Sequence, residues 1–136
     1  MADLIPLFDD PRHNRKVVLG GDLNAYDQSN DKVERGRWQA ILALVESLGL
    51  VNLLKLTQPE RGPLSGCPCV ESACWHVETF RHLSRSADNP GYFTNDHLFA
   101  TKDLADRLVR LEVWGTDRLE VWKLSDHCPL VAHFDL

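Results

Sequence analysis

The sequence has no long run of apolar residues. Its longest apolar stretches are only a few residues long, such as the one at 17–19, whereas a helix that crosses a bilayer needs about 20 consecutive apolar residues. The first residues, Met1–Pro6, also lack the basic stretch and the apolar core of a secretory signal peptide. We therefore expect no contact with a membrane and a cytoplasmic location, where the four cysteines would be mostly reduced thiols.

An excess of basic residues is also lacking. The chain has 15 Lys and Arg against 20 Asp and Glu, a formal net charge of −5, which disfavours unaided binding to a polyanion. It does not exclude a nucleic-acid substrate, because a metal-dependent phosphoesterase gathers carboxylates at its site and recruits a cation there. With 136 residues, of which 43% are hydrophobic and 26% charged, the composition is that of one globular domain or part of one.

The hydrophobic pattern indicates alternating strands and helices. A short β-branched run at 16–19 ends at Gly20 and Gly21, which is typical of a buried strand followed by a turn. Apolar residues at 38, 41, 42, 45 and 48 predict an amphipathic helix over 31–49. The other expected elements are an extended segment over 50–56, a loop over 57–90 with a short strand near 77–81, a strand over 92–101, a helix over 102–108, a hairpin of 109–114 with 119–122, and a strand over 129–134. This order favours a mixed α/β fold.

Polar residues follow the first expected strand directly. Asp22 and Asn24 flank one apolar residue, so in an extended segment both side chains point to the same face and offer oxygens to one target. Such an oxygen pair suits a hard cation or a water molecule. An Asx turn, in which both side chains cap local backbone, explains the spacing equally well.

Two further places combine carboxylates with imidazoles. Asp126 and His127 are adjacent, and such a pair supplies a metal ligand and a general acid or base, although a surface loop explains it as well. Asp96 lies in an apolar strand, where an unpaired carboxylate would cost several kcal/mol. Its partner is then either an Arg in a salt bridge or an imidazole whose tautomer it fixes.

Together these segments resemble a known family. The stretches at 17–24 (VVLGGDLN), 95–99 (NDHLF) and 124–130 (LSDHCPL) are similar to the last three motifs of the endonuclease/exonuclease/phosphatase family, in the family's order. The segment at 79–82 (TFRH) resembles the family's substrate-side strand more weakly. The resemblance covers residues 15–136 and implies hydrolysis of phosphodiesters or phosphomonoesters with Mg²⁺ or Mn²⁺.

The resemblance also implies a role for each residue. His127 would be the catalytic imidazole near the phosphate, and Asp96 would orient and polarise it. Asp22 would orient or deprotonate the attacking water and could contact the metal, Asn24 would steady Asp22 and the phosphate, and Asp126 would help to hold the metal. The substrate would be a phosphate ester, nucleic acid included.

The resemblance corresponds only to the second half of the family's fold. The implied fold class is α/β, as the C-terminal half of a four-layer α/β sandwich, with a mixed, mostly antiparallel sheet and flanking helices. We expect residues 1–136 to form a single partial domain of this kind, because the family's N-terminal half, with its metal-binding Glu, has no counterpart here. The alternative is a catalytically inactive remnant that serves as a binding or assembly module.

A half sandwich would leave one face of its sheet without a partner. Val17, Leu19, Leu98 and Val131 are the residues expected to line that face. Exposed apolar patches seldom persist in soluble monomers, so we expect a homo-oligomer or a second chain that supplies the missing half.

Three thiols and an imidazole lie close together in the expected loop. Cys67, Cys69, Cys74 and His76 are residue types that bind Zn²⁺, but their spacing is not the C-x₂-C pair of structural zinc sites. From the spacing alone, we expect unliganded thiols rather than zinc.

Overall fold

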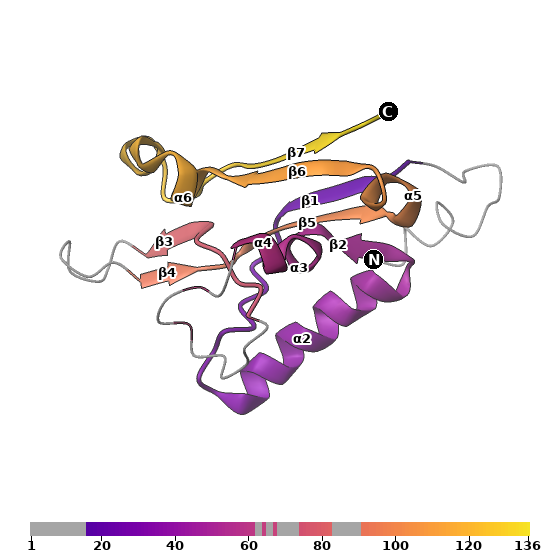
Figure 1. Cartoon of the computed structure of the whole chain (residues 1–136). Helices are drawn as coiled ribbons and strands as arrows, with labels where there is room; N and C mark the ends of the chain where they lie inside the picture. The colour runs from indigo at the N-terminus through magenta and orange to yellow at the C-terminus, as the bar shows by residue number, and fades with distance from the viewer. Residues whose placement is uncertain (1–15, 62–63, 65–66, 68–73, 83–90) are drawn as a thin grey trace.

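The computed structural model describes residues 16–61, 64, 67, 74–82 and 91–136. Its central element is a three-stranded antiparallel sheet in the order β1 (Val18–Asp22), β5 (Asp96–Thr101) and β2 (Leu50–Asn52). Helix α2 (Lys32–Ser47) packs on one face of this sheet (Figure 1). The core on that side consists of Ala25, Leu42, Val45, Leu50 and Phe99.

Helix α2 begins and ends where its sequence predicts. The carboxylate of Asp31 caps its first turn, because Oδ1 accepts hydrogen bonds from the backbone N–H of Val33 and Glu34 at 2.7 and 3.1 Å. The helix stops before Gly49, which has a φ of +81°, a conformation that glycine adopts without strain. The predicted helix over 31–49 is therefore confirmed within two residues at each end.

A second antiparallel sheet covers the other face of β1 and β5. It consists of β6 (Leu108–Val113) and β7 (Leu130–Phe134), which lie above β1 and β5 in Figure 1. Two short helices, α3 (Leu53–Leu56) and α5 (Lys102–Ala105), add side chains to the core between the layers. The residues that form this core are Leu53, Leu54, Val77, Ala100, Leu104, Ala105, Leu111, Val113 and Cys128.

The remaining elements of the described chain are short. Strands β3 (Phe80–His82) and β4 (Gly91–Phe93) form a small antiparallel pair. Three short helical segments complete the described chain, namely α4 (Gln58–Arg61), α6 (Trp114–Asp117) and the 3₁₀ helix η3 (Leu119–Lys123). The protein is thus a small α/β domain with antiparallel sheets and a few helices; the four-layer sandwich stays a prediction.

The expected single strand over 92–101 is wrong. It divides at Thr94 into β4 and β5, which belong to different sheets. The Thr94 N–H donates to Oε1 of Gln28 at 2.8 Å, and the Thr94 hydroxyl donates to the carbonyl of Val77 at 2.6 Å. Because these bonds join Thr94 to two loops, its backbone cannot continue a strand ladder.

The expected hairpin of 109–114 with 119–122 is also wrong. Residues 114–117 and 119–123 form helical turns, and β6 pairs with β7 instead. The indole N–H of Trp122 donates to the carbonyl of Gly115 at 3.0 Å, and Arg118 N–H donates to the carbonyl of Trp114 at 2.8 Å. These bonds fold the segment back on itself. Two expected boundaries also move, because 53–56 is helical rather than extended and the helix after β5 ends at Ala105.

The expectation that Leu19 and Leu98 line the same uncovered face of the sheet is wrong. In the register of β1 with β5, Leu19 pairs with Phe99 and Gly20 pairs with Leu98, so Leu19 and Leu98 point to opposite faces. Leu19 packs beside the α2 core and Leu98 beside the core under β6 and β7. The expected self-association therefore stays a prediction without a single apolar face to support it.

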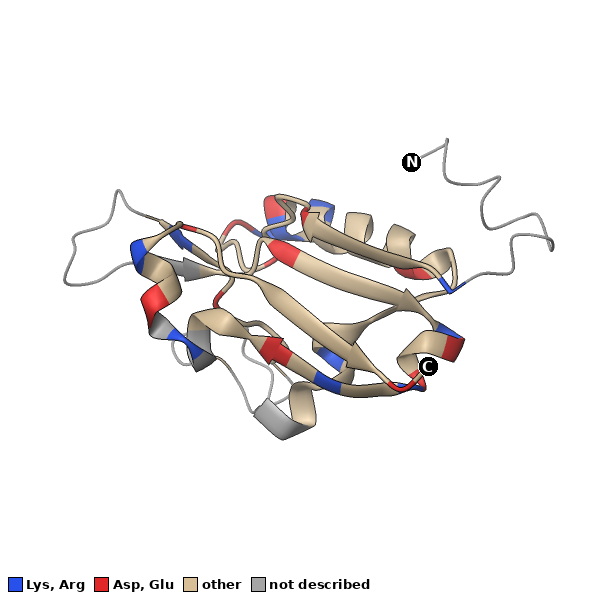
Figure 2. Ribbon diagram, turned by 90° about the horizontal axis from the view of Figure 1, so that it is seen from above, with Lys and Arg blue, Asp and Glu red and all other residues tan. Residues whose placement is uncertain are grey.

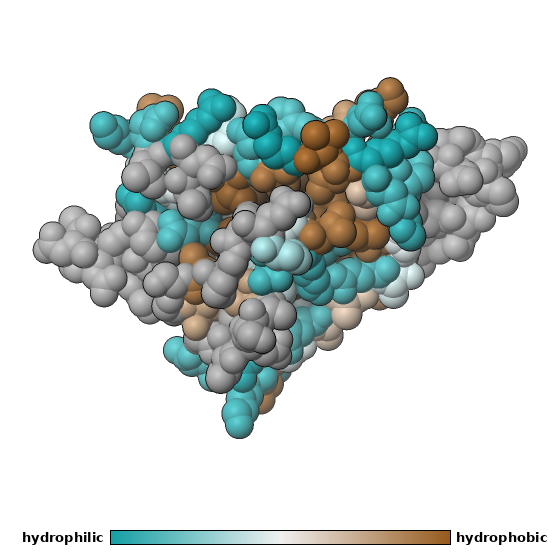
Figure 3. All heavy atoms as spheres, viewed as in Figure 1, coloured by the Kyte–Doolittle hydropathy of each residue, from teal (hydrophilic) through white to brown (hydrophobic). Residues whose placement is uncertain are grey.

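The surface carries charges of both signs. Figure 2 shows acidic and basic residues along the edges and ends of the molecule. In Figure 3, apolar residues gather between the β6–β7 sheet and α2. Within the described parts of the chain, no helix has the length and the hydropathy that a membrane span requires.

Candidate active site

Two strand ends bring the first pair of carboxylates together. Asp22 is the last residue of β1 and Asp96 is the first residue of β5, and the two are register partners. Because the strands are antiparallel, the end of one lies beside the start of the other. The predicted residues therefore meet at one edge of the sheet, where the side chain of Asp96 is 15% exposed and that of Asp22 is 36% exposed.

His127 reaches this edge from the segment that precedes β7. Its backbone forms an isolated antiparallel bridge with Phe80, and the two rings lie 4.8 Å apart. Nδ1 of His127 is 2.8 Å from Oδ2 of Asp96, and Nε2 is 3.9 Å from Oδ2 of Asp22. Asp96 thus pairs with an imidazole, and the hydrogen bond from Nδ1–H to Asp96 leaves Nε2 directed toward Asp22 and solvent.

The electrostatics favour the protonated form of His127. Burial alone lowers the pKa of the imidazole, but the hydrogen bond that Nδ1–H donates to Asp96 and the charges of Asp96, Asp22 and Asp126 outweigh it, so the pKa of His127 is raised above its ordinary value of 6.5. The imidazolium therefore persists to a higher pH than in an exposed histidine.

A local turn fixes the carboxylate of Asp22. The backbone N–H of Asn24 donates to Oδ1 of Asp22 at 2.8 Å, and its side-chain amide donates to Oδ2 at 3.2 Å. Asn24 has a φ of +49°, a left-handed conformation that asparagine tolerates better than most residues. The Asx turn is therefore present. It is compatible with a site role for Asp22, because the carboxylate that it fixes lies 3.9 Å from Nε2 of His127.

Asp126 is exposed, as are Asp22 and Asn24. Its carbonyl accepts a hydrogen bond from the backbone N–H of Arg81 at 2.8 Å, which ties the segment to β3. Its carboxylate is close enough to contribute to the raised pKa of His127. The side chain is free to face solvent, as a ligand for a hydrated cation would be.

Thr79 is a residue that the motif analysis did not single out as part of the site. Its hydroxyl is fully buried and accepts hydrogen bonds from the backbone N–H groups of Asn95 and Asp96 at 2.9 and 3.0 Å. Its carbonyl accepts from the N–H of Cys128 at 2.9 Å. One residue thus connects the start of β5 with the segment that carries His127. Its place as the first residue of the weaker motif at 79–82 is the signal that the sequence offers for it.

Replacing Thr79 with valine should lower the free energy of unfolding by about 1–3 kcal/mol, because a side chain of the same shape would leave two backbone N–H groups without their acceptor. Urea denaturation of the variant measures this change. Thr79→Ser keeps the oxygen and is the matched control, which we expect to be closer to the wild type. Equal stability of the valine variant and the wild type would show that the hydroxyl does not hold this junction.

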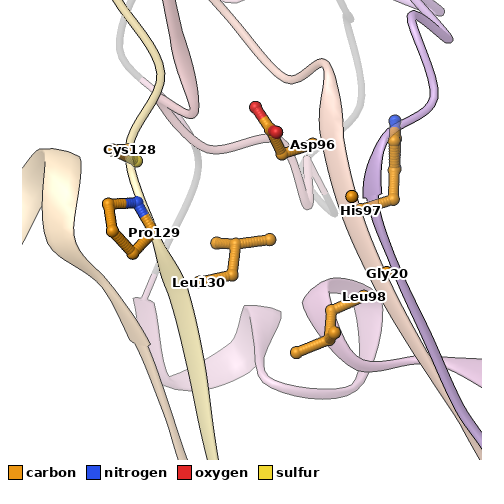
Figure 4. Close-up of a pocket in the computed structure, with 8 residues that line it drawn as sticks. Gly20, Asp96, His97, Leu98, Cys128, Pro129 and Leu130 are labelled. Carbon is orange, nitrogen blue, oxygen red and sulfur yellow. The ribbon is translucent and has the colours of Figure 1, made fainter. Parts of the chain in front are cut away.

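A groove opens beside the carboxylate of Asp96. It has a volume of about 410 Å³ and lies between β1–β5 and the start of β7. Leu98 and Leu130 point into it from facing strands (Figure 4), while His97 projects from β5 on the side away from Leu98. A Cβ atom on Gly20 would come within 2.5 Å of Cδ1 of Leu98, so the glycine keeps the strands close at this point.

The cysteine segment forms a separate cluster. The structure brings together Cys67, Cys74 and His76, whose ligand atoms all lie within 4.8 Å of one another. Cys69 lies outside the described residues. Nε2 of His76 is 2.9 Å from Oδ1 of Asp27, and both side chains are about 5% exposed. Sequence reasoning missed Asp27, because nothing in its surroundings at 25–30 distinguishes it from a loop carboxylate.

Comparison with known proteins gives a likeness in structure only. No protein-family model matches the chain, and no curated protein matches it. Solved structures do match, among them two with a TM-score of 0.60 and 25% sequence identity each: the 3′ phosphatase NExo from Neisseria bound to product DNA hairpin, and the 3′-5′ exonuclease NExo from Neisseria meningitidis. The match covers 96% of this chain and 49% of each NExo chain, so the protein spans about half the length of these neighbours. The site described above therefore lies in a chain that is similar in fold to part of a nuclease and phosphatase.

Proposed function

We propose that the protein is part of a divalent-cation-dependent phosphoesterase that hydrolyses phosphate esters at the ends of nucleic acids. The observation that carries the proposal is the contact of one imidazole with two carboxylates: His127 is bonded to Asp96 through Nδ1 and faces Asp22 through Nε2. The likeness to NExo, whose two structures are described as a 3′ phosphatase and a 3′-5′ exonuclease, supports this reaction class and these substrates.

His127 is the group that contacts the phosphate in this proposal. Its raised pKa favours the imidazolium form, in which Nε2 also carries a proton and can donate to a phosphate oxygen. Asp96 acts as a positioning residue, because its hydrogen bond to Nδ1 fixes the orientation of the ring. In hydrolysis, a cation placed in this way stabilises the charge that develops on the phosphoryl oxygens.

Asp22 is the group that orients the attacking water. Its two oxygens each accept one hydrogen bond from Asn24, which fixes the plane of the carboxylate and leaves lone pairs for a further partner. A water held there gives one proton to Asp22 while its oxygen forms a bond to phosphorus, and the leaving oxygen departs on the opposite side and takes up a proton from solvent. The products are a phosphate or nucleotide and the free hydroxyl.

The donor set suits a hard cation. Mg²⁺ and Mn²⁺ bind through one or two carboxylates together with phosphate oxygens and water, and Asp22 and Asp126 supply two carboxylates around His127. When bound, the cation would neutralise charge on the phosphate. In the described part of the chain, the only group of three or more potential ligands that meet closely is the separate cluster of Cys67, Cys74 and His76. The remaining ligands of the site would therefore come from substrate, water or the half of the fold that this chain does not match.

The test is hydrolysis of a DNA hairpin that ends in a 3′ phosphate and of the same hairpin with a 3′ hydroxyl. Release of inorganic phosphate from the first measures phosphatase activity, and shortening of the second measures exonuclease activity. Each is measured with Mg²⁺, with Mn²⁺ and with EDTA. We expect activity with a divalent ion and none with EDTA.

A folded protein that hydrolyses neither hairpin under any of these conditions would contradict the proposal for this chain. Size-exclusion chromatography of the same sample belongs to the experiment, since we also expect the active species to contain a second copy or a second chain. An active, strictly monomeric sample would overturn that expectation and leave the phosphoesterase assignment intact.

A further inference from the structure

The cluster of Cys67, Cys74 and His76 lies outside the candidate active site and is not used by the proposed reaction. Both sulfur atoms face the same ring nitrogen: Nδ1 of His76 is 3.3 Å from Sγ of Cys67 and 3.4 Å from Sγ of Cys74. Cys74 is 3% exposed and His76 is 5% exposed. Two thiols and an imidazole therefore converge at a buried point.

The distances match those of ligands around a tetrahedral metal. With bonds of about 2.3 Å to sulfur and about 2.0–2.1 Å to nitrogen, a tetrahedral zinc places its sulfur and nitrogen ligands about 3.5 Å apart. The two measured sulfur–nitrogen distances are within a few tenths of an ångström of that value. All three ligand atoms lie within 4.8 Å of one another, whereas two sulfurs bound to a tetrahedral zinc lie about 3.8 Å apart, so binding would draw the two thiolates together by up to about 1 Å.

The partners of the cluster are those that surround metal-bound histidines. Nε2–H of His76 donates to the Asp27 carboxylate at 2.9 Å, which fixes the tautomer and leaves the lone pair of Nδ1 directed at the sulfurs. One lone pair cannot accept good hydrogen bonds from two thiols, whereas it can bind one cation that both thiolates also bind. The side-chain amide of Gln28 donates to Sγ of Cys67 at 3.5 Å, as a bond to a thiolate would require.

The burial of Cys74 and His76 and the charge of two thiolates also suit a bound Zn²⁺ ion. A buried dication needs its charge compensated, and two thiolates compensate that of Zn²⁺. The Trp75 ring lies tilted by 32° against His76, with the ring centroids 4.5 Å apart, and the ammonium group of Lys55 lies 5.5 Å from the Trp75 ring centroid. These side chains limit the access of solvent to the imidazole.

From this geometry we infer that Cys67, Cys74 and His76 supply three of the four ligands of a structural Zn²⁺ ion, with Asp27 holding His76 in the ligating orientation. The inference does not depend on Cys69. It replaces the expectation from spacing alone, since the structure brings together ligands that the motif did not place. Such an ion would tie Cys67 to the segment that leads to Thr79 and, through the bond between His76 and Asp27, to the loop at 25–29.

Metal analysis of the purified wild-type protein tests the inference. We expect about one zinc per chain, retained after dialysis. The double variant Cys67→Ser/Cys74→Ser should lose it, and Asp27→Asn should bind zinc about 10-fold to 100-fold more weakly. Cys128→Ser is the matched control, because Cys128 is also buried but bonds to the carbonyl of Glu78, and it should retain the ion.

A second measurement uses the wild-type chain alone, in case the double variant does not fold. After removal of metal, titration with Co²⁺ should produce thiolate-to-cobalt charge-transfer absorption and the visible bands of a tetrahedral site. Zinc-free protein whose cobalt complex lacks these bands would overturn the inference. A Cys67–Cys74 disulfide in place of zinc, or zinc retained in the double variant, would overturn it as well. None of these readouts depends on phosphoesterase activity.

Discussion

Replacing His127 with alanine is expected to lower the rate of phosphate-ester hydrolysis about 100-fold to 10,000-fold, the usual contribution of a positioned acid or base. In the structure His127 joins Asp96 and Asp22, so its loss removes the donor to the phosphate and leaves two carboxylates that repel it. Steady-state kinetics on the 3′-phosphorylated hairpin measures the effect, which should appear in kcat.

The control for this variant is His133→Ala. His133 lies on β7, its side chain is 45% exposed, and it bonds to Glu112 at 2.9 Å away from the site. Its activity should equal that of the wild type. Equal losses in both variants would point to a general effect on folding, and full activity of His127→Ala would remove His127 from the mechanism.

Replacing Asp96 with asparagine is expected to reduce kcat by a similar order, about 100-fold or more. Asparagine has nearly the same shape but has no charge, so the Asp96 site no longer raises the pKa of His127. NMR titration of the His127 ring should therefore give a lower pKa in the variant than in the wild type. A structural role alone would reduce activity without moving that pKa.

The same contact predicts how stability depends on pH. Because the folded-state pKa of His127 is raised, protonation stabilises the folded protein, and this contribution is fully present below the unfolded-state pKa of about 6.5. It is lost as the pH rises through the raised folded-state pKa. Urea denaturation of the wild type, measured from below pH 6.5 to above the raised folded-state pKa, should show that the free energy of unfolding declines with pH. The Asp96→Asn variant should show a smaller decline. If the free energy of unfolding of the wild type and of Asp96→Asn depended on pH in the same way, the contact with Asp96 would not be the cause of the raised pKa of His127.

The sequence allowed the candidate active site to be predicted better than several of the strands. The short motifs at 17–24, 95–99 and 124–130 contain Asp22, Asn24, Asp96 and His127. These residues could therefore be identified from the local sequence alone. Their catalytic roles stay predictions until the variants are measured. Helix α2 was also predictable, because its apolar spacing and its Asp31 cap are local signals.

What could not be predicted depends on contacts between distant segments. The strand break at Thr94 arises from hydrogen bonds to Gln28 and Val77, which lie 66 and 17 residues away in the sequence. The pattern of apolar residues does not indicate these bonds. Likewise, the spacing of Cys67 and Cys74 argued against a metal, whereas their approach to His76 depends on how the loops fold together.

The segment that carries His127 also closes a sheet. Strand β3 pairs with β4 on one side, and on its other side the bridge between Phe80 and His127 and the bonds from Arg81 N–H to Asp126 and from Cys128 N–H to Thr79 occupy its backbone groups. An unpaired strand edge is a template for intermolecular β-pairing, and Pro129 directly after this segment cannot donate to a further strand. The same few residues that hold the imidazole therefore protect the protein against aggregation, and changes to their backbone will carry a cost in solubility that is separate from any cost in catalysis.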